Sequence, residues 1–277
     1  MLSREFDFFA PSELGEALSV LRDSGDDAKV LAGGMSLMPM MNLGLVRPRV
    51  VLSLNHIDGL DYVREDGNSI SFGALVRHYQ VASHPTIRRF CPMLAEAAAH
   101  IGDVQVRHRG TAAGSIAHAD PAADYLPVLI AYGATFTLRS STGDRQITAE
   151  DFFVDFMTTA LSPDELLVEI SVPKESNVAR SAYRKLARLE GSFAIVNAGA
   201  VIDRSTVRVA VGGVGGRPIL IEQPWEIGGS EGSVVAQIGQ LVYEATKGVV
   251  GEDADYKRSV ARTFSERALR AALTKAS

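Results

Sequence analysis

Residues 31–36 read Leu31-Ala32-Gly33-Gly34-Met35-Ser36, and this stretch decides the fold prediction. A short apolar run from Lys29 ends in two adjacent glycines, and a Met-rich segment with helical character follows from Ser36 to Asn42. Glycines let backbone N–H groups approach an anion, and the start of a helix adds unsatisfied donors and partial positive charge. The stretch therefore has the properties of an anion-binding turn, although a plain tight turn between a strand and a helix has the same pattern.

The segments around this turn predict an α/β unit at the N-terminus. Strands are expected at residues 6–9, 29–32 and 50–54. A helix is expected between the first two strands, with Ser12 as its N-cap and Gly25 as its stop. Alternation of strands and helices in this order is typical of a parallel sheet covered by helices.

Beyond Asn55 the pattern changes to antiparallel strands. Alternating residues predict strands at 62–64, 69–72, 135–138 and 166–172, with Asp66-Gly67 as a hairpin turn and a helix over 93–101. Residues 102–134, dense in Gly, Ala, His and Asp, are expected to be irregular. Strands at 194–202 and 206–213 are followed by helices at about 233–247 and 256–274. The class is therefore α+β with mixed sheets.

Composition and charge exclude several classes of function. The 277 residues include 46% hydrophobic and 22% charged side chains, as in ordinary globular proteins. The formal net charge of −5, without a basic block, argues against nucleic-acid binding. The single cysteine, Cys91, excludes an internal disulfide and a four-cysteine iron–sulfur cluster, and we expect it in the core. The lack of a signal pattern and of a long apolar run predicts a cytoplasmic protein with no membrane span.

A second stretch suited to phosphate is Arg109-Gly110-Thr111-Ala112-Ala113-Gly114-Ser115. It again combines small residues, hydroxyls and a flexible turn. Either stretch alone is compatible with an ordinary turn, but together they are suited to clamp a diphosphate from two sides. The sequence has no Gly-x-x-x-x-Gly-Lys-Ser/Thr loop, and residues 212–216 lack the third glycine of the dinucleotide fingerprint. No His-Glu-x-x-His or Gly-x-Ser-x-Gly motif indicates a metal site or a hydrolase.

Taken together, these stretches resemble the FAD-binding medium subunits of the molybdenum hydroxylases, the family of carbon monoxide dehydrogenase and xanthine dehydrogenase. Residues 32–41 resemble that family's Ala-Gly-Gly-x-Ser/Thr pyrophosphate loop. Residues 104–124 resemble its second loop and the segment after it, and blocks at 152–167 and 182–188 follow in the family's order. The resemblance extends over nearly the whole chain.

The resemblance implies a p-cresol methylhydroxylase-type FAD-binding fold of two α/β sub-domains, residues 1–57 and 58–175, plus a C-terminal sheet-and-helix domain, residues 176–277. FAD would lie between the first two parts and be capped by the third. The cofactor-binding residues implied by the motif are Ala32, Gly33, Gly34, Met35, Ser36, Leu37, Thr111, Ala112, Gly114, Ser115, Ala117, Asp120, Asp124, Leu161, Lys185 and Phe193.

The resemblance also implies a role for the members of this set. Glycines and hydroxyls of the two loops would bind the pyrophosphate. Asp120 and Asp124 would bond the ribityl chain or the adenosine hydroxyls, although Asp124 is also placed to cap a helix beginning near Tyr125. Lys185 would reach the polar edge of the flavin, or else be a solvated lysine. Leu161 and Phe193 would contact the isoalloxazine or fill the core.

Three positions depart from the family pattern. Ala113 stands where a glycine is usual in the second loop, and an alanine there is strained if the position needs a positive φ. Met35 stands where histidine is frequent. Phe193 stands where the carbon monoxide enzyme's subunit has a tyrosine beside the flavin ring. These changes bear on affinity and on the electron acceptor more than on the fold.

By resemblance, the chain is the FAD-binding electron-transfer subunit of a heteromeric molybdenum hydroxylase. Its partners would be a small [2Fe-2S] iron–sulfur subunit and a large subunit with the molybdenum cofactor, since one cysteine cannot hold the clusters here. Electrons would pass from the clusters through FAD to an acceptor, with a docking surface expected near residues 102–110. Two other hypotheses are an autonomous FAD-dependent oxidoreductase and a scaffold subunit that has lost its flavin.

Overall fold

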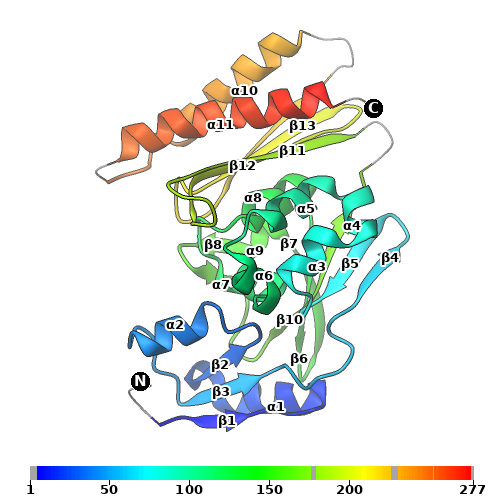
Figure 1. Ribbon diagram of the computed structural model, residues 1–277, viewed down its shortest axis with the longest axis vertical. Helices are drawn as coiled ribbons and strands as arrows, with labels where there is room; N and C mark the ends of the chain where they lie inside the picture. Colours follow the sequence, from blue (N-terminus) through cyan, green and yellow to red (C-terminus); the bar gives the residue numbers. More distant parts are fainter. Residues whose placement is uncertain (1–4, 176–178, 226–229, 252, 276–277) are drawn as a thin grey trace.

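Three main sheets follow one another along the chain in the computed structural model, which describes residues 5–175, 179–225, 230–251 and 253–275, and a fourth sheet has only two short strands. The N-terminal sheet lies at one end of an elongated molecule, and the C-terminal helices lie at the other end (Figure 1). This layering confirms the predicted α+β class. None of the helices in the described ranges is both long and apolar enough to cross a membrane.

The first sheet is parallel and carries the glycine-rich turn. Its strand order is β1 (Asp7–Phe9), β3 (Val50–Ser53), β2 (Ala28–Leu31), and Leu31 pairs with Ser53 at its carboxyl edge. Helix α1 (Leu14–Ser24) and a 3₁₀ turn (Gly25–Asp27) connect β1 to β2, and α2 (Leu37–Asn42) follows the glycines. Parallel strands need such crossovers, so the predicted order of elements is confirmed.

The predicted N-cap of α1 is wrong by one residue. Glu13 occupies the cap position, and no side chain caps the helix there. What anchors α1 is its apolar stripe, since Ala17, Leu18 and Leu21 are all buried. Packing of this stripe, rather than a Ser12 cap, therefore positions the helix.

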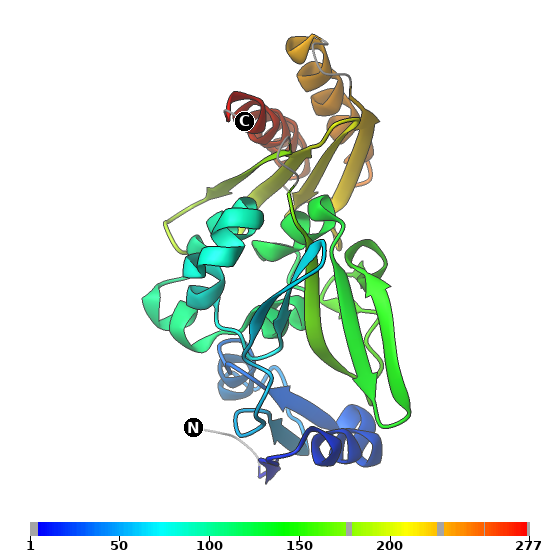
Figure 2. The ribbon, with the colours of Figure 1, turned by 90° about the vertical axis from the view of Figure 1, so that its right-hand side faces the viewer.

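The second sheet is antiparallel and lies beside most of the helices (Figure 2). Its order is β4 (Val63–Asp66), β5 (Ser69–Gly73), β10 (Leu166–Pro173), β6 (Thr135–Ser140), β7 (Gly143–Thr148). Helices α3 (His78–Ser83), α4 (Pro85–Phe90) and α5 (Pro92–Ala99) follow β5. Cys91, at 0% exposure, lies in the core that they share with the sheet, as expected.

The prediction that residues 102–134 are irregular is wrong. They contain α6 (Val104–Arg109), α7 (Ala112–His118) and α8 (Tyr125–Tyr132). Helices α6 and α7 are too short to show a period, and each is capped: Asp103 accepts a hydrogen bond from the N–H of Val106 at 2.8 Å, and Thr111 from that of Gly114 at 3.1 Å. All eight residues of α8 are buried, so its sequence has no polar face to reveal it.

The third sheet separates two cores. Its antiparallel strands are, in order, β11 (Arg180–Ala187), β12 (Ala194–Ile202), β13 (Thr206–Gly212) and β14 (Ile219–Pro224). Helices α10 (Glu231–Ala245) and α11 (Ala254–Thr274) lie close to their predicted positions in the sequence, and they cover one face of the sheet. Helix α8 lies against the other face, so Ala182 joins one core and its neighbour Tyr183 the other.

A compact aromatic group closes the central core. Phe152, at the end of α9 (Ala149–Phe152), and Phe153, at the start of β8 (Phe153–Asp155), both contact Phe136 edge-on. The ring centroids of Phe152 and Phe136 are 4.9 Å apart, and both side chains have 0% exposure. After β8, a tight turn leads to β9 (Thr158–Thr159), and Phe156 in that turn is 65% exposed.

Replacing Phe152 with alanine should destabilise the protein, because it leaves a cavity in this group. We expect a loss of about 3–5 kcal/mol, seen as a fall of roughly 10 °C in the thermal unfolding midpoint. Phe156→Ala is the matched control and should change stability by no more than about 0.5 kcal/mol. Equal unfolding midpoints for the two variants would contradict this account of the core.

Candidate functional site

The first loop, residues 32–37, follows β2 at the edge of the first sheet. Gly34 has a φ of +75°, a conformation that favours glycine. The backbone N–H groups of residues 33–37 donate no hydrogen bond to any described residue. Ser36 precedes α2, but its hydroxyl makes no cap bond, so its role as a helix cap is not realised. A row of free amides and one free hydroxyl is the donor set that a phosphate group needs.

The second loop, residues 110–115, is held from behind by the strand-like segment before α3. The N–H of His78 donates to the carbonyl of Gly110 at 3.1 Å, and that of Ala112 donates to Val76 at 3.0 Å. The hydroxyl of Thr111 is occupied as the cap of α7, whereas that of Ser115 has no protein partner among the described residues. The loop is therefore fixed on one side and leaves Ser115 free.

Ala113 is not strained, although it stands where the family usually has glycine. It lies within α7, is 4% exposed, and is not among the described non-glycine residues with positive φ, which are Ala119 and Met157. A methyl group is compatible with this helical conformation. The concern that Ala113 weakens the second loop through backbone strain therefore does not apply.

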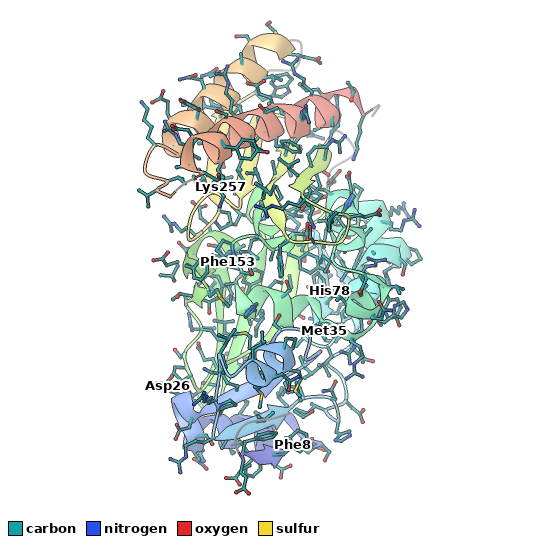
Figure 3. All side chains as sticks on the ribbon, turned by 60° about the vertical axis from the view of Figure 1, so that its left-hand side comes forward. Phe8, Asp26, Met35, His78, Phe153 and Lys257 are labelled. Atoms are coloured by element: carbon teal, nitrogen blue, oxygen red, sulfur yellow. The ribbon has the colours of Figure 1, made fainter. Side chains whose placement is uncertain are left out.

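The two loops meet backbone to backbone. A Cβ atom on Gly33 would lie 2.4 Å from the carbonyl oxygen of Arg109 and 2.6 Å from the Cα of Gly110. A Cβ atom on Gly114 would lie 4.0 Å from that of Ala32. Real side chains do not tolerate the first two distances, so Gly33 is required for the approach. Figure 3 shows Met35 of the first loop and His78, which holds the second loop, near the junction of the N-terminal and central parts of the chain.

Asp124 and Lys185 form a buried ion pair between α8 and β11. Their Nζ–Oδ1 distance is 2.8 Å, and their side chains are 5% and 8% exposed. Lys185 also donates to the carbonyl of His100 at 3.1 Å, and the hydroxyl of Tyr183 donates to Asp124. Burial raises the pKa of Asp124, while the nearby ammonium group of Lys185 acts against this rise. Lys185 is therefore not a solvated lysine, and Asp124 does not cap α8 through its side chain.

The other predicted residues lie around this pair and the loops. Asp120 accepts a hydrogen bond from the N–H of Ala122 at 2.8 Å within its own turn. Ala117 is half-buried on α7, and Leu161 is half-buried against the central core. Phe193 is 62% exposed, so it does not fill the core of the chain. Its ring is accessible to a ligand or a partner.

Two residues that sequence reasoning missed hold the loops together. Asn55 donates from Nδ2 to the carbonyl of Ala32 at 3.0 Å. Arg77 donates from Nη2 to Oδ1 of Asn55 at 3.1 Å, and from Nη1 to the carbonyl of Arg109. Asn55 lies two residues after β3, the strand parallel to β2. Because the carboxyl ends of parallel strands share an edge, this position was the signal in the sequence that could have identified Asn55.

The donor set of this region fits a dinucleotide with a diphosphate. Free amides, free hydroxyls and a glycine-mediated approach come together from residues far apart in the sequence. Among the described residues, no group of three or more His, Cys, Asp or Glu side chains is arranged to hold a metal ion. The arrangement is thus suited to bind an anionic cofactor.

Comparison with known proteins identifies the family. Residues 4–175 match the family described as the FAD binding domain in molybdopterin dehydrogenase. The chain is 36% identical to the carbon monoxide dehydrogenase medium chain of Hydrogenophaga pseudoflava, with 98% of each chain covered. It is 34% identical to the 6-hydroxypseudooxynicotine dehydrogenase complex subunit alpha of Paenarthrobacter nicotinovorans, with 98% of this chain and 95% of that one covered.

Solved structures agree with the sequence comparison. Carbon monoxide dehydrogenase from Hydrogenophaga pseudoflava has a chain that superimposes with a TM-score of 0.93 at 33% identity, covering all of both chains. Quinoline 2-oxidoreductase from Pseudomonas putida has one with a TM-score of 0.86 at 30% identity, covering 98% of both. The chain belongs to the family of FAD-binding medium subunits of the molybdenum hydroxylases, and it is a flavoprotein oxidoreductase subunit with FAD as its cofactor.

Proposed function

We propose that this chain is the electron-transfer subunit of a heteromeric molybdenum hydroxylase that acts in the cytoplasm. A small [2Fe-2S] subunit and a large molybdenum-cofactor subunit would be its partners, and electrons would pass from the clusters through FAD to an acceptor. Bound FAD supplies the ability to accept and release electrons singly or in pairs. The named relatives act on chemically different compounds, which suits a subunit that handles electrons rather than the substrate.

The observation that carries the proposal is the contact between the two loops. Free amides of residues 33–37 and the free hydroxyls of Ser36 and Ser115 would bind the diphosphate from two sides. Gly114, whose N–H is bonded to Thr111, would contribute by leaving room for the diphosphate. Met35 and Leu37 would contribute through their free backbone amides. Ala32, Thr111 and Ala112 would support the contact between the loops, and Ala117 would do so from within α7. The hypothesis of a flavin-free scaffold rests on Ala112-Ala113, and the helical conformation of α7 accommodates both residues.

The rest of the cofactor would extend from the loops toward β11. Asp120 and Asp124 would accept hydrogen bonds from its hydroxyl groups, and Lys185 would orient its polar edge. Leu161 and Phe193 would supply apolar contacts. If the chain is divided at residues 57 and 175, as proposed, the cofactor would contact all three parts.

Replacing Gly34 with valine should abolish flavin retention, because the side chain blocks the approach of an anion and strains a backbone with a φ of +75°. Gly59→Val is the matched control: its φ is +78°, and no atom lies within 4 Å of an added Cβ. The flavin released by denaturation is measured by chromatography and should be FAD. Full flavin content in Gly34→Val would show that the first loop is not the clamp.

Replacing Lys185 with methionine should destabilise the flavin-free protein by about 3–5 kcal/mol, because Asp124 would be left buried without its counter-charge. Adding Asp124→Asn should restore most of the thermal unfolding midpoint. The double variant should also bind FAD more weakly than the parent, as followed by fluorescence titration. Recovered stability with unchanged FAD affinity would remove this pair from the proposed site.

Expressed alone, the chain should contain FAD but have no hydroxylase activity. Expressed with its native neighbours and a tag, it should co-purify with a cysteine-rich small subunit and a molybdenum-containing large subunit, over an interface of at least about 1,000 Å² in total. We expect the interface to include residues 102–110, where Val104 is 52% exposed. Full hydroxylase activity of the isolated chain would favour an autonomous oxidoreductase instead.

A further inference from the structure

Arg77 belongs to a third segment of the chain and bonds a residue next to each loop. It lies between β5 and α3, at the N-cap position of α3. Its guanidinium group donates from Nη1 to the carbonyl of Arg109 and from Nη2 to Oδ1 of Asn55 at 3.1 Å. A planar guanidinium with several fixed donors is suited to hold two acceptors in a set geometry.

The backbone of Arg77 is itself held in place. Its N–H donates to Oε1 of Gln80 at 2.7 Å, and Arg77 forms an isolated antiparallel bridge with Thr111 of the second loop. The side chain therefore starts from a fixed point beside the second loop. Its bond to Asn55 connects it to the segment that follows the first sheet.

Asn55 completes the connection to the first loop. Its Nδ2 donates to the carbonyl of Ala32 at 3.0 Å and to Oγ of Ser53 at 3.1 Å. A continuous series of hydrogen bonds thus runs from Ala32 through Asn55 and Arg77 to Arg109. The series begins at the carbonyl of Ala32 in the first loop and ends at the carbonyl of Arg109, which directly precedes the second loop.

The charge of Arg77 has no ion-pair partner in the described part of the chain. Burial and the neighbouring charge of Arg109 both lower its pKa, while Tyr79 and Asp61 act in the opposite direction. A half-buried cation beside a second cation is unfavourable for the protein alone. An anion bound between the loops would offset that repulsion.

We propose that Arg77 and Asn55 act as one latch that sets the separation of the two loops, which makes Arg77 a positioning residue for the diphosphate of FAD. This inference rests on the diphosphate site proposed above. The donors of the two loops, one loop after β2 and the other between α6 and α7, bind one diphosphate well only if their spacing is maintained within about half an ångström. The absence of a side chain at Gly33 permits the two loops to approach each other but does not hold them together, whereas the latch ties them together.

A double-mutant cycle on FAD affinity tests the latch. Arg77→Met and Asn55→Leu are each introduced into the flavin-depleted chain, and the Kd for FAD is measured by fluorescence titration. Each variant should raise the Kd by about 10- to 30-fold, as expected for loss of hydrogen bonds from a charged donor. The double variant should be no more than about 3-fold weaker than the weaker single variant, because either change opens the same latch. Arg77→Lys should recover part of the affinity.

Arg88→Met is the matched control, because Arg88 is an exposed arginine on α4. The Kd of this variant for FAD should equal that of the parent. Unfolding of each flavin-free variant is followed in parallel. A lower unfolding midpoint with an unchanged Kd would assign Arg77 a general structural role and overturn the latch. Multiplicative effects on the Kd in the double variant would overturn it too.

If Gly34→Val loses flavin while Arg77→Met binds FAD normally, only the latch fails. If Gly34→Val keeps its flavin, the diphosphate site itself fails.

Discussion

The close approach of Gly33 to the backbone of Arg109 and Gly110 is the constraint on which the rest of the site depends. A side chain at Gly33 would lie 2.4 Å from a carbonyl oxygen, so any other residue would force the first sheet away from the second loop. Because the first loop follows a strand of the N-terminal sheet and the second loop joins helices α6 and α7, this contact also sets how the first two parts of the molecule sit against each other. The absence of a side chain at Gly33 is therefore needed both for the packing of these two parts and for the proposed cofactor site.

A second constraint is a buried ion pair, which joins the central part of the chain to the C-terminal part. Asp124 and Lys185 are both nearly inaccessible to solvent, and such a pair is stable only while both members are present. It links the turn before α8 to the first strand of the third sheet. The C-terminal part is therefore attached to the middle of the chain at the proposed position of the flavin.

Much of this arrangement could be predicted from the sequence because its signals are local. The glycines after Leu31, the hairpin around Asp66-Gly67 and the amphipathic stripe of α11 each depend on neighbouring residues. Helices α6, α7 and α8 were missed because two are short and the third is buried all round. A single-sequence pattern has no period to detect in such segments.

The parts that could not be predicted depend on contacts between distant residues. Arg77 and Asn55 belong to no motif, and only the fold brings them to one place. The burial of Lys185 against Asp124 was equally hidden, because a lysine in a strand is usually solvated. Family resemblance indicated that both residues lie near the cofactor, but not that they pair with each other.

Amide hydrogen exchange with and without FAD measures most directly whether both loops hold the cofactor. Since free amides that gain a partner exchange more slowly, we expect residues 33–37 and Ala113, the residue of the second loop whose N–H has no partner among the described residues, to become protected together on addition of FAD. The exposed hairpin between β6 and β7, residues 140–145, should show no change. Protection of only one loop, or of neither, would contradict the two-sided clamp.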